Sequence, residues 1–352
     1  MNELEKIVKP LLDWYQANQR VLPWRTDKNP YRVWVSEIML QQTRVEAVKE
    51  YFKRFMEAVP DVSSLALMEE DQLLKLWEGL GYYNRARNLK KAANQIVERG
   101  SFPSTYQELL TLAGIGDYTA GAIASICFLE QVPAIDGNVL RVISRIVGSY
   151  DNIADPKTKE KIRVLLMPII PKRVDLFNQA LMELGALICL PNGEPNCSAC
   201  PVQSSCFAFQ HQKTDELPVK SKKEKRRVEE RTVLFITDKK NIVLNKREDK
   251  GLLAGLYEFP NVLGHLSEIE QLEQLGPLRD HVIRMEFLGE TKHIFSHIEW
   301  HMYHYILFLD SLPKEDERLW VSRFDLDSKY AIPTAFSKGR RLYEERVNQK
   351  EN

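Results

Sequence analysis

Residues 112–145, LAGIGDYTAGAIASICFLEQVPAIDGNVLRVISR, hold a glycine-punctuated turn, an apolar helix and then an acid among small residues. Gly114 and Gly116 lack Cβ atoms, so the turn can take positive φ and present main-chain N–H groups to a ligand. We expect a helix to begin at Asp117 or Tyr118, with an N terminus that favours an anion such as a DNA phosphate. Taken alone, such a turn is more often a helix connection that binds nothing.

Length and composition limit the possible classes of protein. A chain of 352 residues is longer than one hydrophobic core usually supports, so two or more domains are expected. No stretch has the apolar length of a membrane span, and the start of the chain lacks the pattern of a signal peptide, so a cytoplasmic, nucleoid-associated protein is expected. The 49 basic and 49 acidic residues cancel, so any affinity for nucleic acid must come from local placement of charge.

The spacing of apolar residues changes near the middle of the chain. Residues 1–212 have apolar positions three and four apart and predict a helical domain, and 213–230 are charged and predict an interdomain linker. Residues 231–352 contain VLFITD, NIVLNKR and HMYHYILFLD, which are rich in β-branched and aromatic residues and predict a mixed domain of strands and helices. The expected fold is mainly α with a C-terminal α+β domain.

Four cysteines close the helical half with the spacing C-x7-C-x2-C-x5-C: Cys189, Cys197, Cys200 and Cys206. Tight clustering in an intracellular chain favours one metal centre over disulfides. Four thiolates suit either a structural zinc ion or an iron-sulfur cube, and spacing alone does not decide between them.

Several segments together resemble a known family: LPWR (22–25), WVSEIMLQQTRV (34–45), GLGYYNRARNL (79–89), IDGNVLRV (135–142) and NQALMELGA (178–186). The helical half resembles the helix-hairpin-helix DNA glycosylases of the endonuclease III-like superfamily, and more narrowly the MutY-type adenine DNA glycosylases. The resemblance implies a six-helix part at about 27–135, a cluster part at 1–26 and 136–212, and a [4Fe-4S] cluster on the four cysteines. One departure is the first cysteine gap of seven residues, where this family usually has six.

Two carboxylates suit removal of a base from a deoxynucleotide, because the leaving base needs a proton while positive charge builds on the sugar. Glu37 has apolar neighbours, so burial should raise its pKa, and the resemblance assigns it as the acid that protonates adenine N7. Asp136 is expected to stay ionised near helix N termini and to stabilise or transiently bond the sugar, with Asn138 orienting a water or a carboxylate. The alternatives are a buried, ion-paired glutamate and a plain N-cap aspartate.

Tyr118 separates two enzymatic activities. In the bifunctional relatives that also cleave the strand, the resemblance places a lysine amine at this position, and a tyrosine cannot form the Schiff base. We therefore expect a monofunctional enzyme in which Tyr118 forms hydrogen bonds near the nucleophilic carboxylate. The alternatives are a pyrimidine-lesion glycosylase with lyase activity, or an inert iron-sulfur protein that binds DNA.

A base inside a duplex must be flipped out before it can react, so the resemblance also implies residues that wedge the strands apart. Tyr82 matches the wedge beside the orphaned partner base and Gln42 the wedge on the opposite side, while Gln179 matches the residue that reads adenine. The other implied contacts with DNA or the flipped base are Trp24, Arg25, Leu40, Thr43 and Leu80. The expected partner is duplex DNA with adenine opposite 8-oxoguanine, bound by a monomer that has no membrane association.

The second domain contains GLLAGLYEFP (251–260), which resembles the strand-and-turn signature of Nudix-type domains. The downstream LSEIEQLEQLGPLRD lacks the full acidic pattern that holds magnesium, which disfavours a nucleotide pyrophosphohydrolase. In MutY-type enzymes this domain inspects 8-oxoguanine through a Phe-Ser-His turn, which Phe295, Ser296 and His297 supply. His293, His297 and His301 are spaced by four, but strand alternation favours a shared sheet face over a zinc site.

Overall fold

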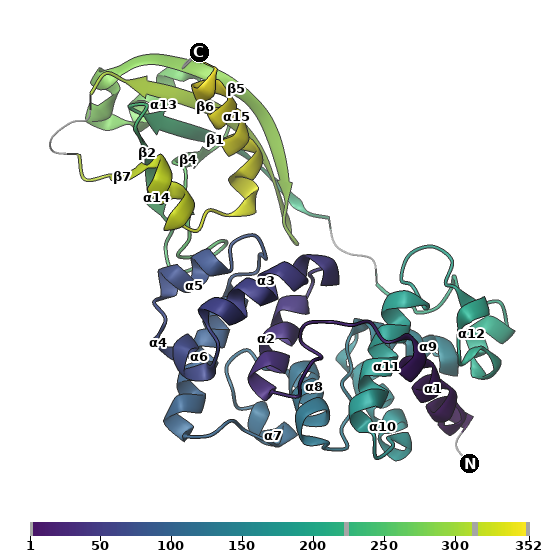
Figure 1. The fold of residues 1–352 in the computed structure, drawn as a ribbon. Coiled ribbons are helices and arrows are strands. Elements are labelled where there is room, and N and C mark those ends of the chain that lie inside the picture. Colours follow the sequence, from purple (N-terminus) through teal and green to yellow (C-terminus); the bar gives the residue numbers. More distant parts are fainter. Residues whose placement is uncertain (1–2, 222–224, 312–315, 350–352) are drawn as a thin grey trace. The chain divides into compact units, whose positions relative to one another are not determined.

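The structure is a computed structural model that describes residues 3–221, 225–311 and 316–349. Contacts divide the chain into two compact units, Met1–Leu67 with Asn88–Lys222 and Met68–Arg87 with Lys223–Asn352. Each unit is described by itself, and Figure 1 labels their elements.

The first unit is helical along its described residues. Its helices are α1 (Val8–Asn18), α2 (Pro30–Leu40), α3 (Val45–Ala58), α4 (Val62–Leu67), α7 (Tyr106–Leu109), α8 (Asp117–Phe128), α9 (Gly137–Val147), α10 (Pro156–Leu166), α11 (Val174–Leu187) and α12 (Phe207–Gln210). The helix α6 (Asn84–Arg99) begins in the second unit and ends in the first. No strand occurs among the described residues up to residue 212, as the apolar spacing predicted. Residues 68–87, however, group with the second unit and not with the rest of the predicted helical domain.

The quoted segment forms the centre of this unit. The helix α8 starts at Asp117, as expected, and its residues from Thr119 to Ile126 are buried. It contacts α2, α7 and α11, so it is apolar on all sides rather than on one stripe. Gly121 allows a close approach, because a Cβ there would lie 2.6 Å from the Pro133 carbonyl oxygen. The chain that follows α8 therefore packs directly against this helix at Gly121.

A second hydrophobic core joins the two ends of the helical sequence. Buried side chains of α1, α9, α10 and α11 meet there, with Tyr15, Phe177 and Leu181 fully buried. The helix α1 packs on α11, and α11 packs on α9. Cys189, Cys200 and Cys206 pack against this core, which places the cysteine loop beside α9 and α11.

The second unit is a mixed sheet with helices on it. Its strands are β1 (Arg227–Thr237), β2 (Asn241–Lys246), β3 (Tyr257–Glu258), β4 (Asn261–Leu263), β5 (Val282–Ile294), β6 (Ile298–Leu309) and β7 (Leu319–Ser322), and its helices are α5 (Glu70–Leu76), α13 (Glu268–Gln274), α14 (Arg323–Ser328) and α15 (Ser337–Asn348). The sheet order is β3-β2-β1-β6-β5, with β4 paired to β1 and β7 paired to β2. The pair β1 and β6 is parallel, and the other pairs are antiparallel.

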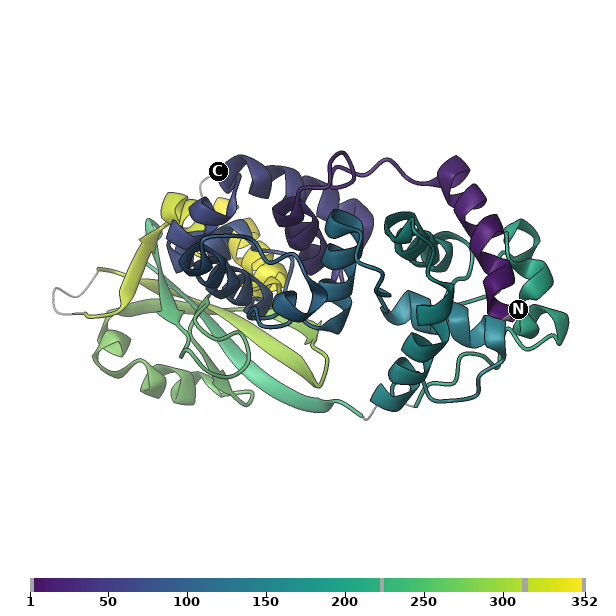
Figure 2. The ribbon, with the colours of Figure 1, turned by 90° about the horizontal axis from the view of Figure 1, so that it is seen from below.

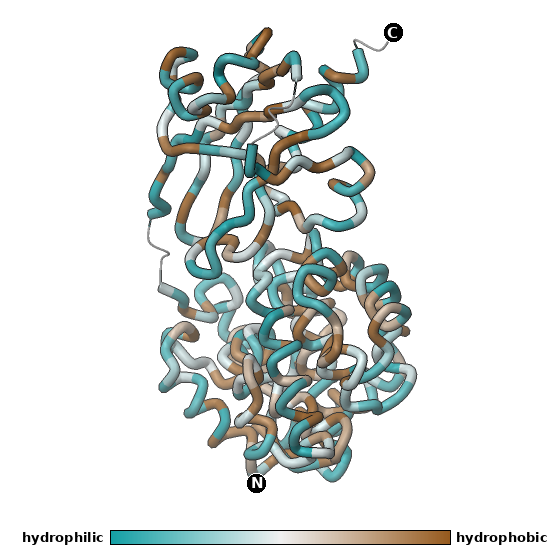
Figure 3. The backbone as a smooth tube through the Cα atoms, turned by 90° about the vertical axis from the view of Figure 1, so that its left-hand side faces the viewer, coloured by the Kyte–Doolittle hydropathy of each residue, from teal (hydrophilic) through white to brown (hydrophobic). Residues whose placement is uncertain are grey.

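Both faces of this sheet carry buried side chains. One face packs with α14 and α15 around Phe235, Trp300 and Phe336, and the other packs near α13 around Leu234 and Leu307. Figures 1 and 2 both show α15 lying against the sheet, and Figure 3 shows brown, hydrophobic segments along its strands. The expected α+β domain is confirmed, and β1, β2 and β6 contain the three segments predicted as strands.

Two sequence-based details differ from the structure. The strand β1 begins at Arg227, inside the predicted linker 213–230, because its charged first residues pair with β6 from Arg227 opposite Ile298 onward. His293 lies opposite Trp300, whereas His301 lies opposite Lys292. Neighbouring residues of a strand point to opposite faces, so these two histidines do not share a sheet face, and that expectation was wrong.

Candidate active site

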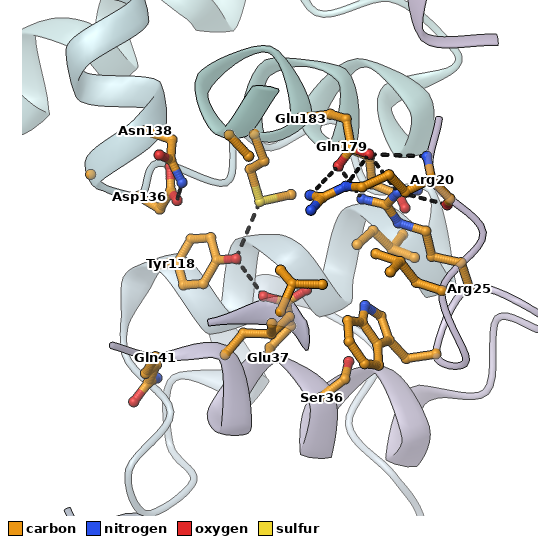
Figure 4. A pocket seen from close by; sticks show the side chains of 18 of the residues that line it. Arg20, Arg25, Ser36, Glu37, Gln41, Tyr118, Asp136, Asn138, Gln179 and Glu183 are labelled. Carbon is orange, nitrogen blue, oxygen red and sulfur yellow. Dashed lines mark hydrogen bonds and ion pairs between the residues drawn. The ribbon is translucent and has the colours of Figure 1, made fainter. Parts of the chain in front are cut away.

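A large cavity of about 930 Å³ opens in the first unit. Its lining comes from the segment before α2, from α2 itself, from the starts of α8 and α9, and from α11. Figure 4 shows Glu37 below, Gln179 and Glu183 above it, and Tyr118 and Asp136 to the left of the cavity. The cavity therefore brings together residues that are far apart in the sequence.

Glu37 is a buried acid on α2. Asn29 caps this helix by accepting from the main-chain N–H groups of Tyr31 and Arg32, and Pro30 occupies its first turn. The Glu37 side chain is 6% exposed. Burial raises the pKa of Glu37 to about 7, the Tyr118 hydrogen bond and Arg25 oppose this rise, and Asp136 adds to it. The predicted upward shift is confirmed, and the carboxyl group can hold a proton near neutral pH.

Asp136 caps the N terminus of α9. Its Oδ1 accepts from the Val139 main-chain N–H at 2.8 Å, and its Oδ2 accepts from Asn138 Nδ2 at 2.7 Å. Asp136 is therefore the N-cap of α9, which the sequence offered as an alternative, and Asn138 donates to its carboxylate. Burial raises the pKa of Asp136, and these donors oppose the rise. Burial thus makes the ionised form of Asp136 less favourable than its position at a helix N terminus alone predicted.

Tyr118 forms a hydrogen bond with the buried acid of the cavity. Its hydroxyl donates to Glu37 Oε2, and Met182 Sδ lies 3.2 Å away. The resemblance placed its hydrogen bonds near the nucleophilic carboxylate, Asp136, and both side chains line the same cavity. The acceptor is Glu37, because α8 packs against α2 and its first turn faces Glu37.

The other pocket residues expected in this unit lie together around the cavity: Trp24, Arg25, Leu40, Gln42, Thr43, Asn138 and Gln179. Trp24 is buried and meets Phe52 edge to face, with ring centroids 5.6 Å apart. Gln42 adopts a φ of 59°. Residues other than glycine rarely have a positive φ, and those that do are often found at functional sites.

Sequence reasoning missed an ion-pair group on α11. Glu183 is 1% exposed and accepts from Arg20 Nε at 2.8 Å and from Arg25 Nη2 at 2.9 Å. The Arg20 main-chain N–H also donates to it, and these cations lower the pKa of Glu183 to about 2 against the effect of burial. Asp175, Gln179 and Glu183 are spaced by four on a helix whose other residues, apart from Asn178, are apolar. That spacing on one face was the signal available in the sequence.

The glycine turn before α8 follows the prediction in part. Gly114 has a φ of 71°, and a Cβ there would lie 2.5 Å from Asn88 Cβ. Gly116 instead has a φ of −93° and forms the N-cap of α8. A Cβ added at Gly116 would meet nothing within 4 Å, so its main chain is open to an approaching group.

Tyr82 and the Phe-Ser-His turn lie together in the second unit. Tyr82 is 51% exposed with a φ of 47°, and its hydroxyl is 2.9 Å from Ser296 Oγ. Residues 295–297 connect β5 to β6, and the Phe295 main-chain N–H donates to the Ile298 carbonyl at 2.8 Å. Leu80 is buried. Arg85 shapes the preceding turn by donating to the main-chain carbonyls at positions 80 and 81.

The four cysteines line one small cavity of the first unit, together with apolar side chains. Asn196 N–H donates to the Ile188 carbonyl at 3.0 Å and closes the longer first gap. Arg145 Nη1 is 3.2 Å from Cys189 Sγ, a geometry that suits a thiolate. In the ranges that the structure describes, no group of three or more His, Cys, Asp or Glu side chains is set closely enough for a single metal ion.

The cysteine loop is connected to the cavity by Arg141. Its Nε donates to the Cys189 carbonyl at 2.8 Å, and its Nη2 donates to Asn138 Oδ1 at 2.9 Å. Asn138 in turn holds Asp136. A chain of hydrogen bonds thus runs from the cysteine loop through Arg141 and Asn138 to the Asp136 carboxylate.

Comparison with known proteins defines the class. The sequence model of the HhH-GPD superfamily of base excision DNA repair proteins matches residues 35–171, and that of the NUDIX domain matches residues 232–339. A thermostable thymine-DNA glycosylase structure is 26% identical and covers 59% of this chain and 97% of its own, with a TM-score of 0.54. The helical part of the chain therefore has the fold of base excision repair glycosylases.

Curated relatives narrow this class. A protein named adenine DNA glycosylase from Mus musculus is 36% identical and covers 95% of this chain and 77% of its own length. One from Buchnera aphidicola (Schizaphis graminum) is 36% identical and covers 82% of this chain and 84% of its own. The match to the Arabidopsis thaliana protein of that name, 38% identical over 86% of this chain, spans only 57% of that relative. The chain belongs to the adenine DNA glycosylase family, as the MutY-type resemblance predicted.

No helix among the described residues is long and apolar enough to cross a membrane.

Proposed function

We propose that this chain removes adenine from duplex DNA in which adenine lies opposite 8-oxoguanine, and leaves the strand intact. The observation that carries this proposal is the pair of differently held carboxyl groups in one cavity. Glu37 has a pKa raised to about 7 by burial, and Asp136 sits at a helix N terminus under two donors. Such a pair suits an acid and a charge-stabilising group in glycoside chemistry.

The proposed reaction breaks the N-glycosidic bond. Glu37 donates its proton to adenine N7, the bonding electrons leave with the base, and positive charge develops on the sugar. Asp136 stabilises that charge, and Asn138 keeps its carboxylate aligned. A water molecule then adds to the anomeric carbon and gives up a proton, and Glu37 regains one. Tyr118, held by Glu37, positions the acid.

DNA contacts are proposed for three places. The open main chain at Gly116 and the N terminus of α8 suit a phosphate. Gln42 and Tyr82, both at positive φ, suit side chains that enter the base stack while the adenine is flipped into the cavity. Trp24, Leu40 and Thr43 would line the path of the flipped nucleotide. The partner is duplex DNA, bound by one copy of the chain.

The second unit is proposed to inspect the opposite base. Ser296 and His297 are exposed at the tip of the β5–β6 connection, and Ser296 can meet the altered edge of 8-oxoguanine, whose N7 carries a hydrogen. Nucleotide hydrolysis is disfavoured, because Glu270 on α13 uses its carboxylate to accept from the Ser267 main-chain N–H and hydroxyl. That carboxylate serves a capping box instead of facing a metal.

A [4Fe-4S] cluster is proposed on the four cysteines, Cys189, Cys197, Cys200 and Cys206. They line one small cavity together, and four cysteine thiolates suit such a cluster. The Arg145 guanidinium near Cys189 suits the negative charge of such a centre. When bound, the cluster would supply folding energy for this loop.

The test is product analysis with a trap for covalent amine intermediates. Duplex carrying adenine opposite 8-oxoguanine should yield free adenine and an intact strand with an abasic site, with no protein–DNA adduct after borohydride reduction. Strand cleavage together with a protein–DNA adduct after borohydride reduction would contradict the monofunctional proposal. Such an adduct requires an amine nucleophile, which Tyr118 cannot provide.

A further inference from the structure

The orientation of the Gln179 amide is fixed by two neighbours. Gln179 Nε2 donates to the Asp175 main-chain carbonyl at 3.0 Å, and Tyr15 Oη lies 3.2 Å from Gln179 Oε1. A carbonyl can only accept, so the amide atom beside Asp175 must be the nitrogen. The Tyr15 hydroxyl therefore donates to the amide oxygen.

Counting donors and acceptors shows what remains for a ligand. An amide has two N–H donors and two acceptor lone pairs. Among the described residues, Tyr15 and Asp175 use one of each. Gln179 lines the cavity on the side opposite Glu37 (Figure 4). One donor beside one acceptor is thus left for a bound base, which matches adenine, whose Watson–Crick edge offers N6–H next to N1.

Tyr15 is built to hold this orientation. It is fully buried on α1 within the core that also contains α11, and the Arg25 guanidinium lies 5.7 Å from its ring centroid. Burial raises the pKa of its hydroxyl, which keeps its proton available for donation. Tyr15 does not line the cavity itself.

We propose that Tyr15 is a positioning residue that sets base specificity by holding the Gln179 amide with its oxygen toward the 6-amino group of the flipped base. This inference rests on the proposed function, because it concerns how that cavity recognises adenine. Guanine and hypoxanthine present the reverse pattern, an acceptor at position 6 and a donor at N1, and a fixed amide leaves them unpaired.

The test compares adenine with unsubstituted purine, which lacks the 6-amino group, each opposite 8-oxoguanine in single-turnover release. In Tyr15→Phe the ratio of the adenine to the purine rate constant should fall about fivefold to tenfold, the loss expected for one neutral hydrogen bond. Tyr31→Phe is the matched control, since Tyr31 is a buried tyrosine of the same unit whose hydroxyl donates to the Val59 carbonyl. It should leave the ratio unchanged.

Two further variants separate positioning from a general effect on folding. In a Gln179→Met background, Tyr15→Phe should not change the ratio further, because it acts through the amide. Replacing Tyr15 with 4-aminophenylalanine, which restores a donor, should restore the ratio. The inference would be overturned if Tyr15→Phe lowered the rate constants for adenine and purine equally, or if it changed their ratio further in the Gln179→Met background. Failure of the unmodified protein to release adenine would instead overturn the proposed function, and this inference with it.

Discussion

The Tyr118 hydroxyl donates to Glu37 Oε2 inside the cavity. This hydrogen bond joins the residue at the position where the resemblance implies a lysine in lyases to the residue proposed as the proton donor. It also lowers the pKa of Glu37, against the larger effect of burial. Tyr118 therefore lacks the amine of a lyase and also influences the protonation of Glu37.

Glu37→Gln should abolish adenine release while leaving DNA binding intact. General acids contribute about 10²–10⁴-fold, and glutamine cannot give up a proton to the base. The measurement is the single-turnover rate beside the dissociation constant for lesion duplex. Glu258→Gln, a buried glutamate of the second unit, serves as the control. A near-normal rate in Glu37→Gln would show that another group protonates adenine.

Tyr118→Phe should move the pH profile upward. Glu37 must be protonated to act, so the rate should fall as the pH rises through its pKa of about 7. Removing the donor that lowers this pKa leaves burial less opposed, so the pKa rises and the alkaline limb moves to higher pH. The single-turnover rate measured across pH checks this. A limb that stays in place or moves to lower pH would contradict the assignment.

Local signals and the family resemblance together predicted much of this site. Apolar neighbours of Glu37 predicted burial and a raised pKa, the frequency of aspartate at helix N-caps suggested the N-cap position of Asp136, and the resemblance implied Gln42 and Gln179. The partner of Tyr118 and the role of Glu183 depend on how α2, α8 and α11 pack, which no local pattern specifies. The positive φ of Gln42 likewise follows from the tertiary structure rather than from residue type.

Glu183→Gln should destabilise the protein at neutral pH. Arginine partners lower the pKa of Glu183 to about 2, so its contribution is present above its usual pKa and is lost as the pH falls toward 2. A shift of this size corresponds to roughly 3 kcal/mol. The free energy of unfolding in urea, compared between variant and parent, should differ clearly at pH 7 and much less near pH 2. Glu98→Gln, at an exposed position, should show no such pattern.

Ser296→Ala should reduce the preference for 8-oxoguanine over guanine opposite adenine by about 1–3 kcal/mol in relative rate, as for loss of one base contact. Tyr82→Phe is the informative companion, because it removes the same Tyr82–Ser296 hydrogen bond but keeps the serine. If Ser296 reads the lesion, only the alanine variant loses the preference. Equal losses would assign the effect to the hydrogen bond between the two side chains.

Metal analysis should give four irons and four sulfides for each chain, with a broad absorption near the blue end of the visible range. Cys200→Ser should lower the iron content and slow adenine release, because Arg141 connects the cysteine loop to Asn138 and Asp136. One zinc ion in place of iron would contradict the proposed cluster.

The most direct test of the central claim is single-turnover release of free base from three duplexes, carrying adenine opposite 8-oxoguanine, adenine opposite guanine, and thymine glycol. We predict rapid release of adenine opposite 8-oxoguanine, slower release opposite guanine, and no release of thymine glycol. Activity restricted to thymine glycol would contradict the account.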